Sequence, residues 1–287
     1  MPSTVWIDGK WYDRSTAVVS VFDHGLLYGD GVFEGIRAYG GRVFRLAEHI
    51  DRLYASAKAI WLDVPLGKAE MTRIVEEGVA KSGIREAYIR LVVTRGVGDL
   101  GLDPRKCAKP STICIIDTIR LWSPERYEQG LTALTAATPI NHRESLSPRV
   151  KSLNYLTHIL AKLEGIAAAV DEVIMLDSTG HVAEASGMNL FAVTRGVVRT
   201  PPPYSGILRG VTRDTVLEIA REAGYATEEL PLNRYDLYTA DEVFLTGTAA
   251  EVVGISKLDG RAIGAGTAGP VTKDLAARFR AYVTRGD

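Results

Sequence analysis

The sequence predicts an α+β protein of two domains. Its 287 residues are about twice the length of a typical domain. Strand and helix patterns are mixed without the regular strand–helix–strand order of a parallel sheet. Ser-Pro and several charged residues interrupt both patterns at 119–129, which is typical of a connector. We therefore expect an N-terminal domain over 1–118, a connector over 119–129 and a C-terminal domain over 130–287.

The first domain begins with two hairpins and continues with a helix and two strands. Asp8-Gly9 and Gly40-Gly41 are each flanked by strand-forming residues, and such pairs suit the backbone of tight hairpin turns. Apolar residues recur at helical spacing after the second hairpin, and runs rich in β-branched residues predict the further strands. The expected elements are strands at 5–7, 11–12, 32–39, 43–45, 88–94 and 112–117 and a helix at 47–60.

The second domain mixes the same patterns. Apolar residues recur every three or four positions from Leu153 to Ile166, which predicts one amphipathic helix. The turn residues of Asp177–Gly180 predict a third hairpin. The expected elements are strands at 131–136, 173–176, 182–184 and 242–246, and helices at 153–166, at 211–223 and after Gly269-Pro270.

The composition gives no support for nucleic-acid or membrane binding. The formal net charge is −1, from 34 Lys+Arg and 35 Asp+Glu without a block of one sign, whereas both partners select a localised basic surface. No apolar run has the length of a membrane span or of a signal-peptide core. Cys107 and Cys114 match neither a disulfide framework nor a metal-ligand spacing. We expect a soluble cytoplasmic protein that binds small molecules and no metal.

Lys151 stands where a lysine can become a nucleophile. It directly precedes Ser152, a candidate N-cap, and the helix expected from Leu153. The positive end of a helix dipole disfavours an ammonium group beside it, and an imine-forming lysine requires a lowered pKa. An ordinary surface lysine at a loop–helix junction would have the same position, so the residues alone leave both interpretations open.

The segment Val150-Lys151-Ser152-Leu153-Asn154-Tyr155 resembles the lysine segment of the fold-type IV pyridoxal 5′-phosphate (PLP) enzymes. The resemblance implies that Lys151 carries PLP as a Schiff base and that Tyr155 hydrogen-bonds the phenolic oxygen of PLP. It also implies a small N-terminal α/β sandwich domain and a larger C-terminal pseudo-barrel domain. Proteins of this group are homodimers or larger homo-oligomers, and we expect the same here.

Four further segments resemble cofactor-binding parts of this group. HVAEASGMNLF (181–191) resembles the segment whose carboxylate pairs with the pyridine nitrogen, which implies this role for Glu184. A helix N-terminus favours an anion, and the residues that open the helix at 211 resemble a phosphate site. A Gly-Thr-Ala turn and the segment EHIDRL (48–53) complete the resemblance. The implied phosphate-binding residues are Arg52, Gly210, Val211, Thr212, Gly247 and Thr248.

The substrate-binding residues are implied by two N-terminal motifs and by the Gly-Thr-Ala turn. YGDGVFEGIR (28–37) resembles the motif that lines the side-chain pocket, and Tyr88-Ile89-Arg90 resembles a Tyr-x-Arg strand that receives carboxylates. Residues 88 and 90 of one strand point to the same face. The implied substrate-binding residues are Tyr28, Phe33, Gly35, Arg37, Tyr88, Arg90, Thr248 and Ala249.

The motifs favour a branched-chain amino acid aminotransferase that uses 2-oxoglutarate. D-amino-acid aminotransferases typically carry Arg-x-His after the Tyr88-type strand, whereas this chain has Arg105-Lys106-Cys107. The spacing from Lys151 to Tyr155 nevertheless matches D-enzymes as well as archaeal branched-chain enzymes. The alternatives are therefore a D-amino-acid or R-amine transaminase, an aminodeoxychorismate lyase, and a non-catalytic protein that binds a phosphate ligand.

Overall fold

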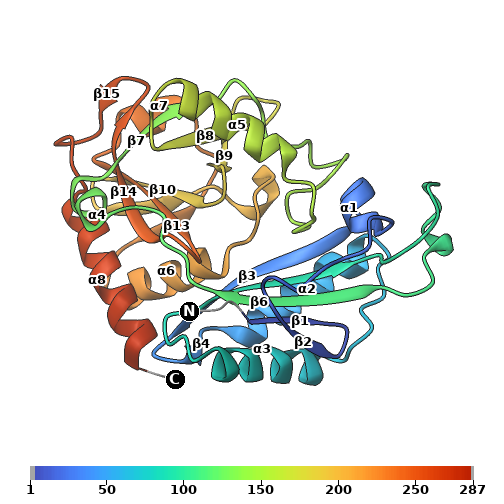
Figure 1. Ribbon diagram of the computed structural model, residues 1–287. Helices are drawn as coiled ribbons and strands as arrows, with labels where there is room; N and C mark the ends of the chain where they lie inside the picture. Colours follow the sequence, from blue (N-terminus) through green and yellow to red (C-terminus); the bar gives the residue numbers. More distant parts are fainter. Residues whose placement is uncertain (1–3, 286–287) are drawn as a thin grey trace. The chain divides into compact units, whose positions relative to one another are not determined.

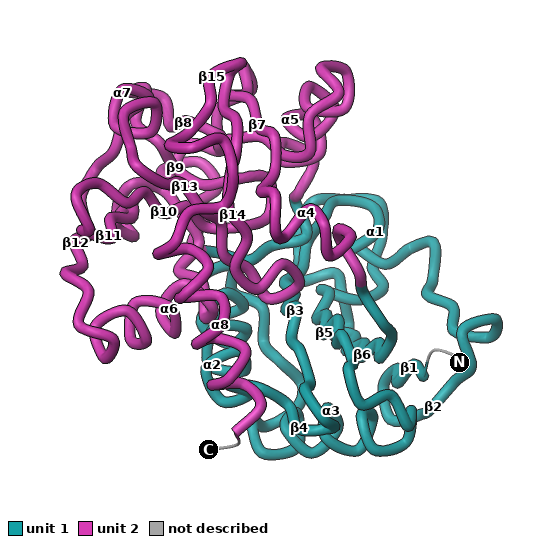
Figure 2. The backbone as a smooth tube through the Cα atoms, turned by 90° about the vertical axis from the view of Figure 1, so that its left-hand side faces the viewer, with its two compact units in different colours: residues 1–119, 150–154, 286 teal, residues 120–149, 155–285, 287 magenta. Residues whose placement is uncertain are grey.

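The computed structural model of the protein describes residues 4–285, and the chain divides into two units (Figure 2). Unit 1 holds the described residues up to Ile119 together with Val150–Asn154. Unit 2 holds Arg120–Arg149 and Tyr155–Arg285. Each unit has its own sheet and its own apolar core.

The division differs from the expected one in two places. The segment Val150–Asn154, which we expected in the C-terminal domain, belongs to unit 1 because its backbone bonds to that of Gly31 and Phe33. Most of the expected connector belongs to unit 2, since Trp122 and Tyr127 pack against the core of that unit. Neither difference is visible in local sequence patterns, because both arise from contacts with distant parts of the chain.

Unit 1 is built on a six-stranded antiparallel sheet with the order β2-β1-β6-β5-β3-β4 (Figure 2). The predicted turns Asp8-Gly9 and Gly40-Gly41 join β1 to β2 and β3 to β4, so both hairpin predictions are confirmed. The strands are β1 (Thr4–Ile7), β2 (Lys10–Asp13), β3 (Gly31–Tyr39), β4 (Arg42–Val43), β5 (Tyr88–Thr94) and β6 (Ser111–Asp117).

Two helices cover one face of this sheet (Figure 1). Helix α2 (Leu46–Ala59) confirms the prediction for 47–60, and α3 (Lys68–Ser82) was not predicted. Their apolar side chains, such as Leu53, pack with Ile36 and Ile89 in one buried cluster. Because successive strand residues point to opposite faces, the odd-numbered residues of β3 lie on the face away from these helices.

Unit 2 is built on a nine-stranded mixed sheet with the path β12-β11-β10-β13-β14-β7-β8-β9 and with β15 paired to β14. Strands β9 and β10 lie five places apart in this order, which would separate them by roughly 24 Å in a flat sheet. Residues 186–188 alone join them, and such a link spans at most about 14 Å. The sheet must therefore curl, as the predicted pseudo-barrel requires.

Six elements predicted for unit 2 are confirmed: the strands at 131–136, 173–176, 182–184 and 242–246 are β7, β8, β9 and β13, and the helices at 211–223 and after Gly269-Pro270 are α6 and α8. The strands are β7 (Leu131–Thr135), β8 (Glu172–Leu176), β9 (Val182–Ala185), β10 (Asn189–Thr194), β11 (Val197–Thr200), β12 (Thr227–Glu229), β13 (Glu242–Gly247), β14 (Glu251–Leu258) and β15 (Arg261–Ala262). The helices are α4 (Pro124–Gln129), α5 (Leu156–Ala167), α6 (Val211–Glu222), α7 (Arg234–Tyr238) and α8 (Pro270–Arg285).

The predicted amphipathic helix departs from expectation in its start and in its environment. Helix α5 begins at Leu156, three residues later than expected. Its buried side is formed by His158, Ala161 and Gly165, whereas its apolar stripe is exposed, with Ile166 at 64%. Across residues 4–285, no helix combines the length and the apolar character that crossing a membrane requires.

Candidate active site

Lys151 is held in unit 1 by an extended segment that pairs with the free edge of β3. The Phe33 N–H donates to the Lys151 carbonyl at 2.9 Å, and the Leu153 N–H donates to the Gly31 carbonyl at 3.0 Å. The Lys151 N–H donates to the Ser56 hydroxyl of α2 at 3.1 Å. The Lys151 ammonium lies 4.6 Å from the centroid of the Phe33 ring, a distance at which a cation–π attraction operates.

The expected helix-dipole effect on Lys151 is wrong. The helix starts at Leu156 with Tyr155 as its N-cap, because the residues after Lys151 pair with β3 in place of entering a helix. Since the dipole acts only within the first turn, it does not act on a side chain five residues before the helix. The neighbourhood of Lys151 is instead made by β3 and α2.

Four of the expected substrate-binding residues meet on one face of β3 and β5. Strand pairing places Gly35 opposite Arg90. The Arg90 guanidinium donates to the Tyr88 hydroxyl at 3.3 Å and lies 4.5 Å from the centroid of the Phe33 ring. Gly35 leaves room for the Tyr88 hydroxyl, because a Cβ at position 35 would lie 2.2 Å from Tyr88 Oη. The result is a cation and a hydroxyl beside an apolar ring, which suits a carboxylate next to an alkyl chain.

Arg37, Tyr28 and Arg105 have other neighbours. Arg37 lies on the same strand face but stacks on the Tyr39 ring at 5.0 Å. Tyr28 belongs to α1 (His24–Tyr28), and its hydroxyl donates to the Leu100 carbonyl at 2.5 Å. Arg105, in the 3₁₀ turn Pro104–Lys106, is 87% exposed and bonds Asp103, whose pKa it lowers to about 2.

Arg52 lies on α2 in a buried ion pair with Glu34 of β3. Its Nε donates to Glu34 Oε1 at 2.6 Å and its Nη2 to Oε2 at 2.8 Å. His49 Nδ1 lies 2.8 Å from the same Oε2. Neither Glu34 nor His49 was predicted as a site residue, although a glutamate within the apolar run of β3 is a signal, since such a buried carboxylate requires a partner.

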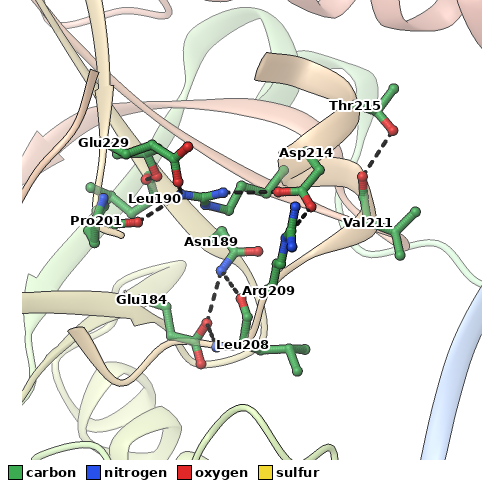
Figure 3. Close-up of polar contacts among 12 residues, drawn as sticks. Glu184, Asn189, Leu190, Pro201, Leu208, Arg209, Val211, Asp214, Thr215 and Glu229 are labelled. Atoms are coloured by element: carbon green, nitrogen blue, oxygen red, sulfur yellow. Dashed lines mark hydrogen bonds and ion pairs between the residues drawn. The ribbon is translucent and has the colours of Figure 1, made fainter. Parts of the chain in front are cut away.

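Glu184 is a buried carboxylate of unit 2 with fixed orientation (Figure 3). Its Oε2 accepts from Asn189 Nδ2 at 3.0 Å and from the Leu208 N–H at 3.1 Å. The same Asn189 amide donates to the Leu208 carbonyl at 2.8 Å. Asn189 therefore ties β9, β10 and the segment before α6 together. No role was predicted for Asn189, because an amide within an apolar strand indicates a role only once its hydrogen-bond partners are known.

Gly210 lies directly before α6 and beside this network. It is the N-cap, and no side chain caps the helix there, so backbone N–H groups of the first turn, including those of Val211 and Thr212, are oriented toward an acceptor outside the helix. A Cβ on Gly210 would lie 2.0 Å from Asn189 Oδ1. Only glycine fits this close approach, which places a helix end that suits an anion next to the carboxylate network.

The Gly-Thr-Ala turn joins β13 to β14 at residues 247–250. A Cβ on Gly247 would lie 3.0 Å from Met188 Cγ. Thr246, which pairs with Asn189, has a buried hydroxyl without a hydrogen-bond partner in the structure. A buried polar atom of this kind and an uncapped helix end are features of a cradle that an anionic group completes.

Tyr155 lines a cavity of about 520 Å³ within unit 2. Its ring stacks on that of His158 with centroids 4.5 Å apart, and His158 Nδ1 bonds the Ser186 carbonyl at 2.9 Å. Of the expected residues, Gly247 and Ala249 line the same cavity, and Trp122 and Met188 are additional wall residues that were not predicted. Trp122 comes from the expected connector.

Comparisons with known proteins agree with this chemistry. The family model for amino-transferase class IV matches residues 31–258. A Methanocaldococcus jannaschii protein is 52% identical over 98% of this chain and 96% of its own length. The branched-chain-amino-acid aminotransferase of Pseudomonas aeruginosa is 38% identical over 94% of this chain and 90% of its own.

Solved structures show the same similarity. The T.th. branched-chain amino acid aminotransferase with pyridoxamine 5′-phosphate matches with a TM-score of 0.95 and 37% identity, covering 100% of this chain and 96% of that one. The same enzyme complexed with N-(5′-phosphopyridoxyl)-L-glutamate matches with a TM-score of 0.94, 37% identity and the same coverage.

Proposed function

This chain belongs to the class IV aminotransferases, and on that premise we propose that it transfers the amino group of L-leucine, L-isoleucine or L-valine to 2-oxoglutarate. The products are branched 2-oxo acids and glutamate. One observation carries this proposal: the chain matches branched-chain aminotransferases over nearly its whole length. The ligand of the second T.th. structure contains glutamate, which supports glutamate and 2-oxoglutarate as the second pair.

The cofactor is PLP: the structural relatives hold pyridoxamine 5′-phosphate, its aminated form, and N-(5′-phosphopyridoxyl)-L-glutamate, its adduct with glutamate. The residues fit it. The uncapped start of α6 and the buried, unpartnered Thr246 hydroxyl suit a phosphate. The fixed Glu184 carboxylate suits a protonated pyridine nitrogen. We assign the phosphate to Arg52, Gly210, Val211, Thr212, Gly247 and Thr248, and the phenolic oxygen to Tyr155.

PLP, when bound, supplies an electron sink that makes the Cα proton of an amino acid acidic. The amine of Lys151 would hold the cofactor and, once the amine of a substrate takes its place there, would move the proton at the substrate Cα as general base and acid. The carboxylate of Glu184 keeps a proton on the pyridine nitrogen, which is an electrostatic role. Arg90 and Tyr88 bind a substrate carboxylate, and Phe33 contacts the alkyl chain.

The D-amino-acid alternative has less support. Arg105 lies in an exposed turn, and its guanidinium donates to the carboxylate of Asp103, two residues before it. No described contact links it to Tyr88 or Arg90. Half-reaction rates with L-leucine, D-alanine and R-1-phenylethylamine decide between the alternatives, and a rate with either of the last two above that of L-leucine would overturn the assignment.

The spectrum of the purified protein tests the proposed function. We expect a band near ~410–430 nm from the bound cofactor, lost on adding L-leucine and restored by 2-oxoglutarate. Borohydride reduction followed by peptide mapping should place the pyridoxyl group on Lys151. A protein without the band, or with the label on another lysine, would contradict the proposal.

A second copy of the chain is the proposed partner. The exposed apolar stripe of α5 includes Leu160 and Leu163, 48% and 51% exposed, and stripes of this kind mark interfaces. Light scattering should report a homodimer or a larger homo-oligomer, and Leu163→Glu should shift it toward monomer, whereas an unchanged mass would remove α5 from the interface.

We also place the enzyme in the cytoplasm, since Cys107 and Cys114 are both free thiols.

A further inference from the structure

Arg52, assigned above to the phosphate, belongs to a hydrogen-bonded set in unit 1 whose other two titratable side chains, Glu34 and His49, have no role assigned above. Glu34 of β3 has a fully buried side chain, His49 is 2% exposed and Arg52 is 14% exposed. Both carboxylate oxygens of Glu34 bond Arg52, and Oε2 also accepts from His49 Nδ1 and from the Gly35 N–H at 3.2 Å. We refer to this set as the Glu34 triad.

The charge state of the Glu34 triad follows from its burial and its contacts. Burial opposes ionisation of Glu34, but the Arg52 guanidinium and the His49 ring outweigh it and hold the pKa of Glu34 far below its usual range. Burial, together with the charges of Arg52 and Lys151, lowers the pKa of His49 although Glu34 opposes this. The lowered pKa favours the neutral ring. Because a carboxylate only accepts, the Nδ1 atom that faces Glu34 carries a hydrogen.

A stabilising role does not explain this arrangement well. Removing two charges from water costs as much as their attraction returns, and apolar residues of similar volume often stabilise such sites equally. The two hydrogen bonds between Glu34 and Arg52 fix the plane of the guanidinium, and the further bond from His49 fixes the carboxylate. The buried set therefore indicates a requirement for a defined position of Arg52.

The position of Arg52 is tied to that of Lys151. Arg52 and Ser56 are four residues apart on α2 and so share one helix face, and Ser56 accepts the Lys151 N–H. On β3, Glu34 adjoins Phe33, whose N–H donates to the Lys151 carbonyl and whose ring lies 4.6 Å from the Lys151 ammonium. The same helix and the same strand thus place both cationic side chains.

We propose that Glu34 and His49 are positioning residues for the cofactor: they hold the guanidinium of Arg52 at a set place relative to Lys151, ready for the phosphate of PLP. The inference rests on the proposed function, because it takes PLP as the ligand. Orientation before binding reduces the conformational entropy lost on binding. The role is specific to the phosphate, so the triad should matter for PLP and not for pyridoxal, which lacks the phosphate.

The test measures dissociation constants of PLP and pyridoxal for the full-length apo-protein by absorbance. Glu34→Gln keeps the volume and removes the charge, and it should raise the Kd of PLP about tenfold to a hundredfold while the Kd of pyridoxal stays unchanged. Glu48→Gln is the matched control, because Glu48 lies on the same helix and pairs with Arg45 at 2.8 Å but is 46% exposed; it should change neither constant.

A second comparison isolates the link to Arg52. In an Arg52→Lys background the bidentate geometry is already lost. Glu34→Gln should therefore raise the Kd of PLP in that background by less than about twofold. His49→Ala should weaken PLP binding and His49→Asn, whose amide replaces the Nδ1–H donor, should restore it. These two His49 variants also test the positioning role if Glu34→Gln fails to fold.

The outcomes separate the inference from the proposed function. A wild-type protein that binds no PLP and gives no reduced adduct at Lys151 refutes the proposed function itself. A wild-type protein that binds PLP, with Glu34→Gln and His49→Ala either unchanged or weakened equally toward PLP and pyridoxal, refutes only the positioning role. Loss of PLP affinity alone, rescued by His49→Asn, supports it.

Discussion

Replacing Gly35 by alanine should damage the proposed substrate-binding face of unit 1 without entering its core. Gly35 lies on β3 opposite Arg90, and an alanine Cβ would lie 2.2 Å from the Tyr88 hydroxyl oxygen. Contacts below 3.0 Å are essentially never observed for a real Cβ, so the hydroxyl has to move by about 0.8 Å. Its bond from Arg90 is already 3.3 Å long and would break.

The size of the effect follows from that displacement. A misplacement of about 1 Å in a positioning group can cost about a hundredfold in rate, so we expect kcat/KM for L-leucine to fall by roughly 30- to 100-fold. The free energy of unfolding should fall by about 1–3 kcal/mol, which is the usual range for overpacking. Steady-state kinetics and urea unfolding of Gly35→Ala measure the two quantities.

Removing the hydroxyl provides the internal control. In a Tyr88→Phe background the nearest remaining ring atom would lie 3.0 Å from the new Cβ, which a small shift relieves. Gly35→Ala should therefore lower kcat/KM much less in that background than in the wild type. The reasoning is refuted if Gly35→Ala retains the wild-type kcat/KM, or if its cost is the same with and without the hydroxyl.

Three further predictions concern unit 2. Glu184→Gln should keep PLP but slow the single-turnover loss of its absorbance band by at least about a hundredfold, because an amide does not hold a proton on the pyridine nitrogen. Gly210→Ala should raise the Kd of PLP about tenfold or more, since its Cβ would lie 2.0 Å from Asn189 Oδ1. Burial opposes ionisation of Asp259, but its bonds with Thr135 and Tyr238 lower its pKa below 3.8. The stabilisation is therefore present above pH 3.8 and fades as the pH falls through the lowered pKa, so Asp259→Ala should cost about 1–3 kcal/mol of unfolding free energy at about pH 7 and less at about pH 3.

Each of these has a control or a contrary outcome. Glu228→Gln, at an exposed partner of Arg199, should leave the single-turnover rate unchanged, and a wild-type rate in Glu184→Gln would remove its electrostatic role. Gly67 is the N-cap of α3 and has nothing within 4 Å of a Cβ, so Gly67→Ala should bind PLP normally. An Asp259→Ala deficit that grows on acidification would contradict the sign of the pKa shift.

Hairpins and most strands could be predicted because their signals are local. Asp8-Gly9 and Gly40-Gly41 adopt backbone angles with positive φ, and such turn residues favour hairpins wherever they stand between strand-forming runs. The strand at 88–94 was predicted to the residue. The family motifs also directed attention to Lys151 and Glu184, since each motif is a contiguous stretch of sequence.

Contacts between distant segments could not be predicted in this way. The expected helix from Leu153 failed because residues 151–153 pair with β3, more than a hundred positions earlier, and pairing of this kind overrides helical periodicity. The helical period of α5 was correct, but periodicity does not state whether a stripe faces the core or the solvent. The roles of Glu34 and Asn189 likewise depend on partners outside their own strands.

The sequence by itself determined the turns, the periods of most helices and strands, and the class of chemistry, because each is encoded in neighbouring residues. Only the tertiary structure decided what surrounds Lys151: a strand edge and the face of α2 that carries Arg52 and Ser56, in place of a helix N-terminus. It also decided that Asn189 links Glu184 to the start of α6. The physical reason is the same in both cases, since buried polar groups must find partners, and the curling and pairing of strands determine which distant residues those partners are.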